Sequence, residues 1–147
     1  MLRRRPAHGV NDSDGPTIVF DTICTKDRIP WLANPTCHTL LCQVWVESSA
    51  WLVGRYVIMP DHIHLFAAPN VRNIDFDSWV AYWKRKFSLA AQNPSLRWQR
   101  DHWDRRMRSN ESYAEKWDYV RNNPVRHGLV GNSDDWPYQG ELNILTW

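Results

Sequence analysis

The segment of residues 53–67 constrains the fold of this chain more than any other. Two runs rich in apolar and β-branched residues, 53–59 and 62–67, are separated only by a Pro-Asp pair. A connection this short predicts that the two runs pair as a β-hairpin. In the second run, His62 and His64 alternate with large apolar residues. Both histidines should therefore point away from the buried side of the sheet.

The other segments alternate between strand-like and helix-like patterns. A β-branched run predicts a first strand, and Asn34-Pro35 supplies a helix N-cap followed by a proline at the first helical position. Three- and four-residue spacing of apolar side chains predicts the helices. The predicted elements are strands at Thr17–Cys24, Val53–Met59, His62–Ala67 and Trp98–Met107, and helices at about Thr36–Trp51, Asp75–Gln92 and Ser109–Asn122, the last ended by Pro124.

This order is the ferredoxin-like, RRM-like βαββαβ pattern of an α+β protein, followed by an extra C-terminal helix. It predicts an antiparallel sheet with helices on one face and with the first and third strands as central neighbours. His62 and His64 then lie in the middle of the sheet. The extra helix, which carries Tyr119, must dock close to that face if the two motifs are to meet.

Composition is that of an ordinary globular protein. At 147 residues and 43% apolar content, we expect a flexible basic arm over residues 1–16 and a single domain over 17–147 that ends in a tail. No stretch approaches the roughly 20 apolar residues of a membrane span, and three cysteines without a paired spacing indicate reduced thiols in a cytoplasmic protein.

Basic residues gather in local clusters, several of them beside aromatic rings. The net charge of +2 is too small to indicate a nucleic-acid partner by itself. Arginine and lysine supply phosphate contacts, and aromatic faces stack on unpaired bases, although such charges can also form an ordinary solvated surface around core tryptophans. The stacking candidates are Trp83, Phe87, Trp98 and Trp103, and the predicted DNA contacts are Arg3, Arg4, Arg5, Lys84, Arg85, Lys86, Arg105 and Arg108.

Two spaced pairs carry the candidate chemistry. His62 and His64 lie two apart in a strand, roughly 6.5–7 Å at Cα, so both rings can reach one metal ion. Tyr119 and Asn123 lie four apart and would share a helix face. Each pair also has a plain interpretation, as sheet histidines and as a half-buried helix tyrosine. Asp61 is either a turn residue or a partner that orients an imidazole.

The motifs resemble a known family. The matching segments keep their order and spacing across about residues 53–130, and the two outer motifs together are specific. The segments are Tyr56–Leu65, Trp83-Lys84 with Phe87, Trp98-Gln99 with Trp103-Asp104-Arg105 and Arg108, and Tyr119–Val130. They are similar to the single-tyrosine HUH transposases, and most similar to the REP-associated tyrosine transposases.

The resemblance implies a DNA-associated endonuclease and strand transferase that acts on single-stranded DNA through a 5′-phosphotyrosine intermediate. It makes Tyr119 the nucleophile, His62 and His64 metal ligands, and Asn123 a third ligand. The implied cofactor is a divalent metal, Mg²⁺ or Mn²⁺. The implied partner is single-stranded or hairpin DNA rather than a membrane, and the protein would act as a monomer or homodimer.

Two other functions remain open on the sequence. A domesticated relative could bind hairpin DNA or RNA without cutting it. A zinc hydrolase could use His62 and His64 with a bound water, although such a site usually needs a further protein ligand. His102 is a candidate base, or a DNA contact on a sheet face.

Overall fold

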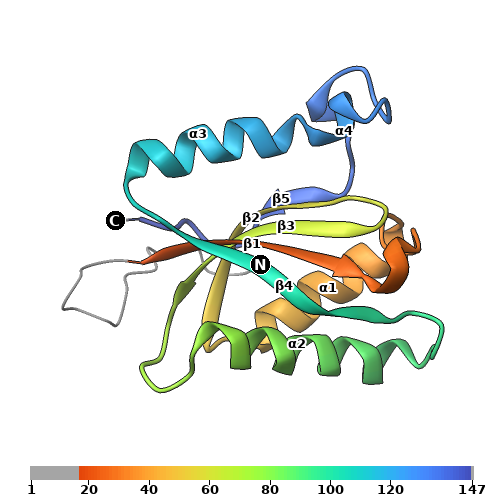
Figure 1. Ribbon diagram of the computed structural model, residues 1–147, viewed down its shortest axis with the longest axis horizontal. Coiled ribbons are helices and arrows are strands. Elements are labelled where there is room, and N and C mark those ends of the chain that lie inside the picture. Colours follow the sequence, from red (N-terminus) through yellow and green to blue (C-terminus); the bar gives the residue numbers. More distant parts are fainter. Residues whose placement is uncertain (1–16, 147) are drawn as a thin grey trace.

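A computed structural model describes residues 17–146 of the chain (Figure 1). Its centre is a five-stranded sheet in the order β4-β1-β3-β2-β5, in which all neighbouring strands are antiparallel. The strands are β1 (Ile18–Thr25), β2 (Trp51–Ile58), β3 (His62–Pro69), β4 (Trp98–Met107) and β5 (Gln139–Glu141). The first four strands have the order and pairing of a ferredoxin-like fold, so the predicted α+β class is confirmed.

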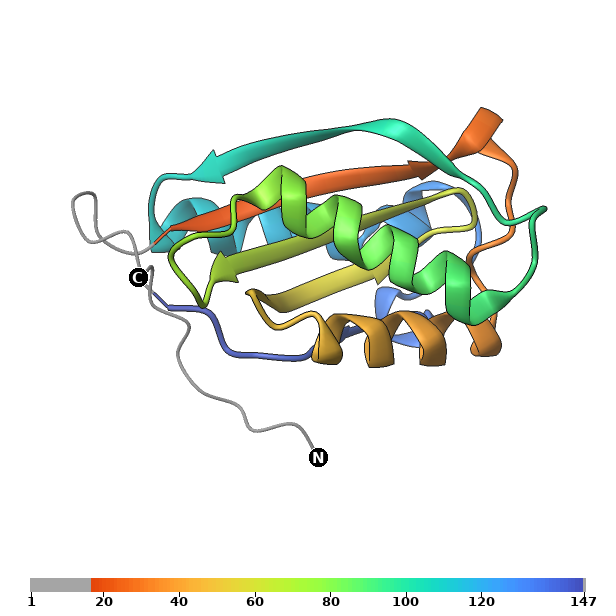
Figure 2. The same ribbon diagram turned by 90° about the horizontal axis from the view of Figure 1, so that it is seen from below.

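Helices cover both faces of this sheet. Helices α1 (Pro35–Glu47) and α2 (Phe76–Ala91) lie side by side on one face, and α3 (Asn110–Arg121) crosses the opposite face (Figures 1 and 2). Short helices follow β1 and α3 and precede β5. They are η1 (Lys26–Arg28), α4 (Asn123–Arg126) and η2 (Ser133–Asp135).

Polar side chains begin the three long helices. Asn34 accepts a hydrogen bond from the backbone N–H of Cys37, with Pro35 in the first turn, as the sequence predicts. Asp75 caps α2 and Ser109 caps α3 in the same way. Each cap satisfies a backbone donor that the first helical turn leaves unpaired. The start of each helix is therefore set locally by its own sequence.

Each face of the sheet packs on its own apolar layer. Between the sheet and α1 and α2 lie the large aromatic residues Trp45, Trp79, Trp83 and Phe87. Between the sheet and α3 lies a second layer made by side chains from the strands, from α3 and from the C-terminal segment. This second layer comprises Ile18, Phe20, Val57, Met59, Phe66, Ala68, Met107, Tyr113, Val120, Trp136 and Leu145. The sheet is thus buried on both sides.

Three details of the predicted fold are wrong. Helix α1 ends at Glu47, because β2 already begins at Trp51. Pro124 does not stop helical structure; it occupies the first turn of the new helix α4, where its missing N–H costs nothing. The segment expected to be a plain tail forms η2 and strand β5, which extends the sheet beyond β2.

The sequence analysis also made predictions about the N-terminal arm and about membrane-spanning segments. The arm of residues 1–16, with Arg3, Arg4 and Arg5, lies outside the described residues. Within residues 17–146, no helix has the length and apolar character needed to cross a membrane.

Candidate functional site

His62 and His64 lie on β3 and face α3. Their ring centroids are 4.7 Å apart at an angle of 76°. Ile63 and Leu65, which alternate with them, are fully buried in the layer beneath α1 and α2. Strand alternation therefore places both imidazoles on one side of a central strand, as the sequence predicts.

Neighbouring polar groups orient each ring. The Nδ1 of His62 lies 2.7 Å from Asp61 Oδ1, and the Nδ1 of His64 lies 3.0 Å from the Thr22 hydroxyl on the adjoining strand. A carboxylate only accepts, so Asp61 requires the proton of His62 on Nδ1. In both rings Nε2 is then left to face a ligand, which makes Asp61 an orienting residue as well as a turn residue.

Arg28 completes this arrangement, and sequence reasoning missed it. Its Nε donates to Asp61 Oδ2 at 3.0 Å, and its Nη2 lies 3.3 Å from the Nδ1 of His62. The backbone of Asp27 and Arg28 has positive φ values of 55° and 56°, an uncommon conformation for residues other than glycine. The signal available in the sequence was the position of Arg28 just past β1, whose end pairs with the start of β3.

Burial keeps both imidazoles neutral. It lowers the pKa of His62, while Asp61 acts in the opposite direction. Burial, helped by the positive charges of Lys116 and Arg126, lowers the pKa of His64 to about 3. Neutral imidazole is the form that binds a metal ion.

Tyr119 and Asn123 lie at the junction of α3 and α4 rather than in one continuous helix. Tyr119 belongs to the last turn of α3 and is 60% exposed, whereas Asn123 begins α4 and is buried. The prediction of a shared helix face is therefore wrong in detail, since the helix breaks at Asn122.

Arg126 joins these two residues. Its guanidinium lies 3.8 Å from the centroid of the Tyr119 ring, and its Nη1 donates to the Tyr119 carbonyl at 2.8 Å. Its Nη2 donates to Asn123 Oδ1 at 3.1 Å, which leaves that oxygen a second lone pair. Arg126 belongs to the same motif as Tyr119, but sequence reasoning gave it no role.

The two motifs meet on one face of the sheet. Lys116 lies 4.8 Å from the Phe20 ring centroid and 5.6 Å from that of Tyr119. Phe20 in turn stacks on His64 at 5.4 Å. Lys116 and Arg126 both act electrostatically on His64. Docking of α3 on the sheet therefore brings the tyrosine and the histidine pair into one electropositive site.

The residues predicted to contact DNA are divided between the two faces. Arg105 lies on the α3 side, where it is register partner to Phe20 and acts electrostatically on Lys116. Arg108 is exposed just beyond the end of β4. Lys84, Arg85 and Lys86 lie on α2, across the sheet from the histidines (Figure 2).

Two residues of that α2 group have partners inside the protein. Lys84 is 9% exposed, and its ammonium donates to the carbonyls of Gln99 and Arg100 at 2.9 and 3.5 Å. Lys86 lies 3.4 Å from Glu47. Burial counts against Lys84 as a DNA contact, since its charge already links α2 to β4.

The predicted stacking residues differ in their exposure to solvent. Trp83 and Phe87 are fully buried, so these two are not available to bases, while Trp98 is half-buried against the same core. Trp103 is 57% exposed. It pairs in register with Thr22, which pairs with His64, so it lies in the same row on the α3 face. Trp103 is therefore the exposed candidate on the same face as the histidines, with β1 between it and His64.

The curated proteins similar to this chain share one name. No family model matches. The chain is 30% identical over 86 residues to the REP-associated tyrosine transposase of Escherichia coli K12, covering 58% of this chain and 52% of that protein. A relative from Haemophilus influenzae, whose name proposes the same function, is 31% identical over 94 residues, covering 55% and 53%. The chain spans about half the length of these curated relatives.

A solved structure extends the similarity to nearly the whole chain. It is that of a REP-associated tyrosine transposase bound to a REP hairpin, and it aligns with a TM-score of 0.74 and 25% identity over 95% of this chain and 81% of that one. The chain therefore shares the α+β fold of that transposase structure. Together, the matches support the assignment of this chain to the REP-associated tyrosine transposases.

Proposed function

We propose that this protein is a metal-dependent endonuclease and strand transferase for single-stranded DNA that flanks a hairpin. The observation that carries the proposal is that Lys116 and Arg126, which contact Tyr119 and Asn123, also act electrostatically on His64. The transposase relatives support the same general role.

The donor set fits a divalent metal. Two neutral imidazoles present Nε2, and the amide oxygen of Asn123 keeps a lone pair beside its bond from Arg126. Bound there, the ion would withdraw charge from the scissile phosphate and fix its position. Because all three ligands are neutral and Arg28, Lys116 and Arg126 are close by, we expect tight metal binding only when the DNA phosphate adds negative charge.

In the proposed reaction, the Tyr119 hydroxyl oxygen bonds to phosphorus as the phosphorus–O3′ bond breaks. The phenol loses its proton to solvent and the departing O3′ takes one up, which leaves a 5′-phosphotyrosine and a free 3′-hydroxyl. Lys116 and Arg126, which lie against the tyrosine ring, would stabilise negative charge that develops on the phosphate. Reversal with another 3′-hydroxyl joins strands without an outside energy source.

An exposed aromatic side chain on the same face favours a substrate with unpaired bases. Trp103 is exposed in the row of His64 and can stack on an unpaired base, whereas a regular duplex hides its bases. One relative has been solved with a REP hairpin. We propose that this chain also takes a DNA hairpin with a single-stranded flank, and binds it more weakly as salt rises.

The decisive experiment tests for a covalent adduct. Labelled hairpin DNA with a single-stranded flank is incubated with the protein and Mn²⁺, then separated by denaturing electrophoresis. The wild-type protein should give a protein–DNA band that Tyr119→Phe abolishes. Tyr82→Phe, which changes an exposed tyrosine on α2, should leave the band unchanged.

Further results separate the proposed roles. Replacing His62 and His64 together by alanine should abolish cleavage while hairpin binding persists, because arginine contacts to phosphate do not need the ion. Asn123→Ala should cause a milder loss, since water can replace one neutral ligand. An adduct that persists in Tyr119→Phe, or cleavage undiminished in excess chelator, contradicts the mechanism. Binding without any cleavage would favour a non-catalytic hairpin-binding protein.

A further inference from the structure

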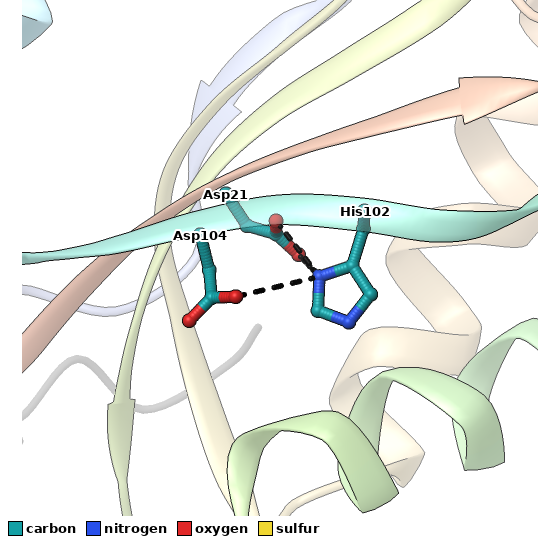
Figure 3. Close-up of side chains that lie close together, drawn as sticks. All are labelled: Asp21, His102 and Asp104. Carbon is teal, nitrogen blue, oxygen red and sulfur yellow. Dashed lines mark hydrogen bonds and ion pairs between the residues drawn. The ribbon is translucent and has the colours of Figure 1, made fainter.

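Three potential metal ligands gather on the other face of the sheet, beneath α2. Figure 3 shows Asp21 from β1 with His102 and Asp104 from β4. Asp21 and Asp104 are register partners, and His102 lies two residues before Asp104, so all three point to one side. Their candidate ligand atoms all lie within 4.8 Å of one another.

Asp21 is a carboxylate whose hydrogen bonds are incomplete. It is fully buried, and the Nδ1 of His102 lies 3.0 Å from its Oδ1 and 2.9 Å from its Oδ2. The His102 ring nitrogen is hydrogen-bonded to Oδ1, whereas Oδ2, although close to the same nitrogen, has no hydrogen-bond partner among residues 17–146. A buried carboxylate is costly unless positive charge compensates it. Asp104 adds a second carboxylate, with Oδ1 3.9 Å from the same ring nitrogen.

The other nitrogen of His102 is already oriented. Its Nε2 lies 3.1 Å from Asp77 Oδ1 in the first turn of α2. An imidazole that ligates a metal through one nitrogen typically donates the other N–H to a carboxylate, which fixes the ring. Asp77 therefore supplies the outer contact that a metal-binding histidine requires.

The charge balance of this cluster is the reverse of that at the His62–His64 site. Three carboxylates face one imidazole, and the nearest lysine, Lys84, has its ammonium hydrogen-bonded to the carbonyls of Gln99 and Arg100. An excess of negative charge attracts a cation without help from DNA. A cleft of about 780 Å³ between α2 and β4 offers a route of entry; it is lined by Asp77, His102 and Asp104, and also by the cationic side chains of Lys84, Arg85 and Arg100.

We propose that Asp21, His102 Nδ1 and Asp104 bind a divalent cation of the Mn²⁺ type, with Asp77 holding the ring. Adjacent ligands of an octahedral ion lie roughly 3.0 Å apart when each bond is about 2.1 Å. The 2.9 and 3.0 Å separations between His102 and Asp21, which are those of their present hydrogen bond, would therefore need little change when an ion replaces the proton. Carboxylate and imidazole together suit Mn²⁺. The ion would displace the Nδ1 proton to solvent, and water would fill the remaining positions.

Such an ion would stabilise the sheet on the face opposite to His62 and His64. It would tie β1 to β4 and, through Asp77, to the start of α2. Asp21 is adjacent in sequence to Thr22, which contacts His64 on the opposite face. The inference does not depend on the proposed nuclease function, since it concerns the protein without DNA.

The first experiment isolates this site. The variant with both His62 and His64 replaced by alanine is titrated with Mn²⁺ in the absence of DNA, with free ion followed by electron paramagnetic resonance. We expect one bound Mn²⁺ per chain and a rise in melting temperature on binding. Absence of uptake at pH 8 would overturn the proposal and leave a protonated His102 as the partner of Asp21.

A matched pair of variants tests which carboxylate is used. In the same background, Asp104→Asn should weaken Mn²⁺ binding by roughly tenfold or more. Asp101→Asn removes the same charge from an exposed position on the same strand and should change the affinity by less than about twofold. Asp104 is 41% exposed, so its replacement should leave the circular dichroism spectrum unchanged. Equal effects of the two variants would indicate diffuse attraction and would contradict a site.

Discussion

Phe66→Leu should lower the rate of DNA cleavage more than its effect on stability explains. Phe66 is fully buried on β3, two residues after His64, and belongs to the layer that supports α3. Its ring centroid lies 4.8 Å from that of Tyr113 and 6.4 Å from that of Trp117, both on α3. Shrinking this ring should let the helix that carries Tyr119 shift against the histidines.

The expected cost can be worked out from these contacts. A hydrophobic swap of similar volume costs less than about 1.5 kcal/mol, and loss of an aromatic pair adds about 0.5–1.5 kcal/mol. We therefore expect a loss of about 1–2 kcal/mol, which in a chain of this size lowers the melting temperature by about 3–6 °C. A misplacement of the nucleophile by a fraction of an ångström should slow cleavage by roughly tenfold.

Phe87→Leu is the matched control. Phe87 is equally buried and contacts two aromatic rings, Trp31 and Trp98, where Phe66 contacts Phe20 as well as the two α3 rings; Phe87 lies in the layer beneath α1 and α2. Both variants should lose similar stability in urea unfolding, while only Phe66→Leu slows adduct formation at 25 °C, where both are folded. Wild-type cleavage by Phe66→Leu, or equal slowing by both variants, would refute the reasoning that packing under α3 positions the tyrosine.

Three further predictions use other contacts of the same molecule. Asp61→Ala should raise the Mn²⁺ concentration needed for half-maximal cleavage by roughly tenfold, since His62 loses its acceptor; an unchanged Mn²⁺ dependence would deny Asp61 that role. Trp103→Ala should weaken binding to a hairpin with a single-stranded flank by about 1–3 kcal/mol and blunt duplex much less, as measured by fluorescence anisotropy, with Trp103→Phe nearly wild-type; an equal loss on both DNAs would argue against stacking. Without metal, urea unfolding should show stability falling as the pH drops below about 6.5, because burial lowers the pKa values of His38 and His64, so the unfolded chain binds these protons first. His102, whose pKa is raised chiefly by its hydrogen bond to Asp21, opposes this trend, and His38→Gln should flatten the slope.

The sequence alone determined the order of elements and the face that the histidines occupy. Alternation of His62 and His64 with apolar residues fixed their side of the strand, because successive strand side chains point to opposite faces. Asn34-Pro35 and Ser109 fixed two helix starts, because N-caps act within a few residues. These are local rules, so a single sequence was enough to apply them.

Only the tertiary structure decided what those side chains meet. Arg28 reaches Asp61 and His62 across more than thirty residues of sequence, and the Asp21–His102 contact joins strands that are 81 residues apart. The break at Asn122 aims Arg126 back at Tyr119 and Asn123, and the burial of Lys84, Trp83 and Phe87 removes them from the surface. Such contacts depend on how strands pair and how α3 docks. The residue types and spacing within one segment do not determine its distance to another segment.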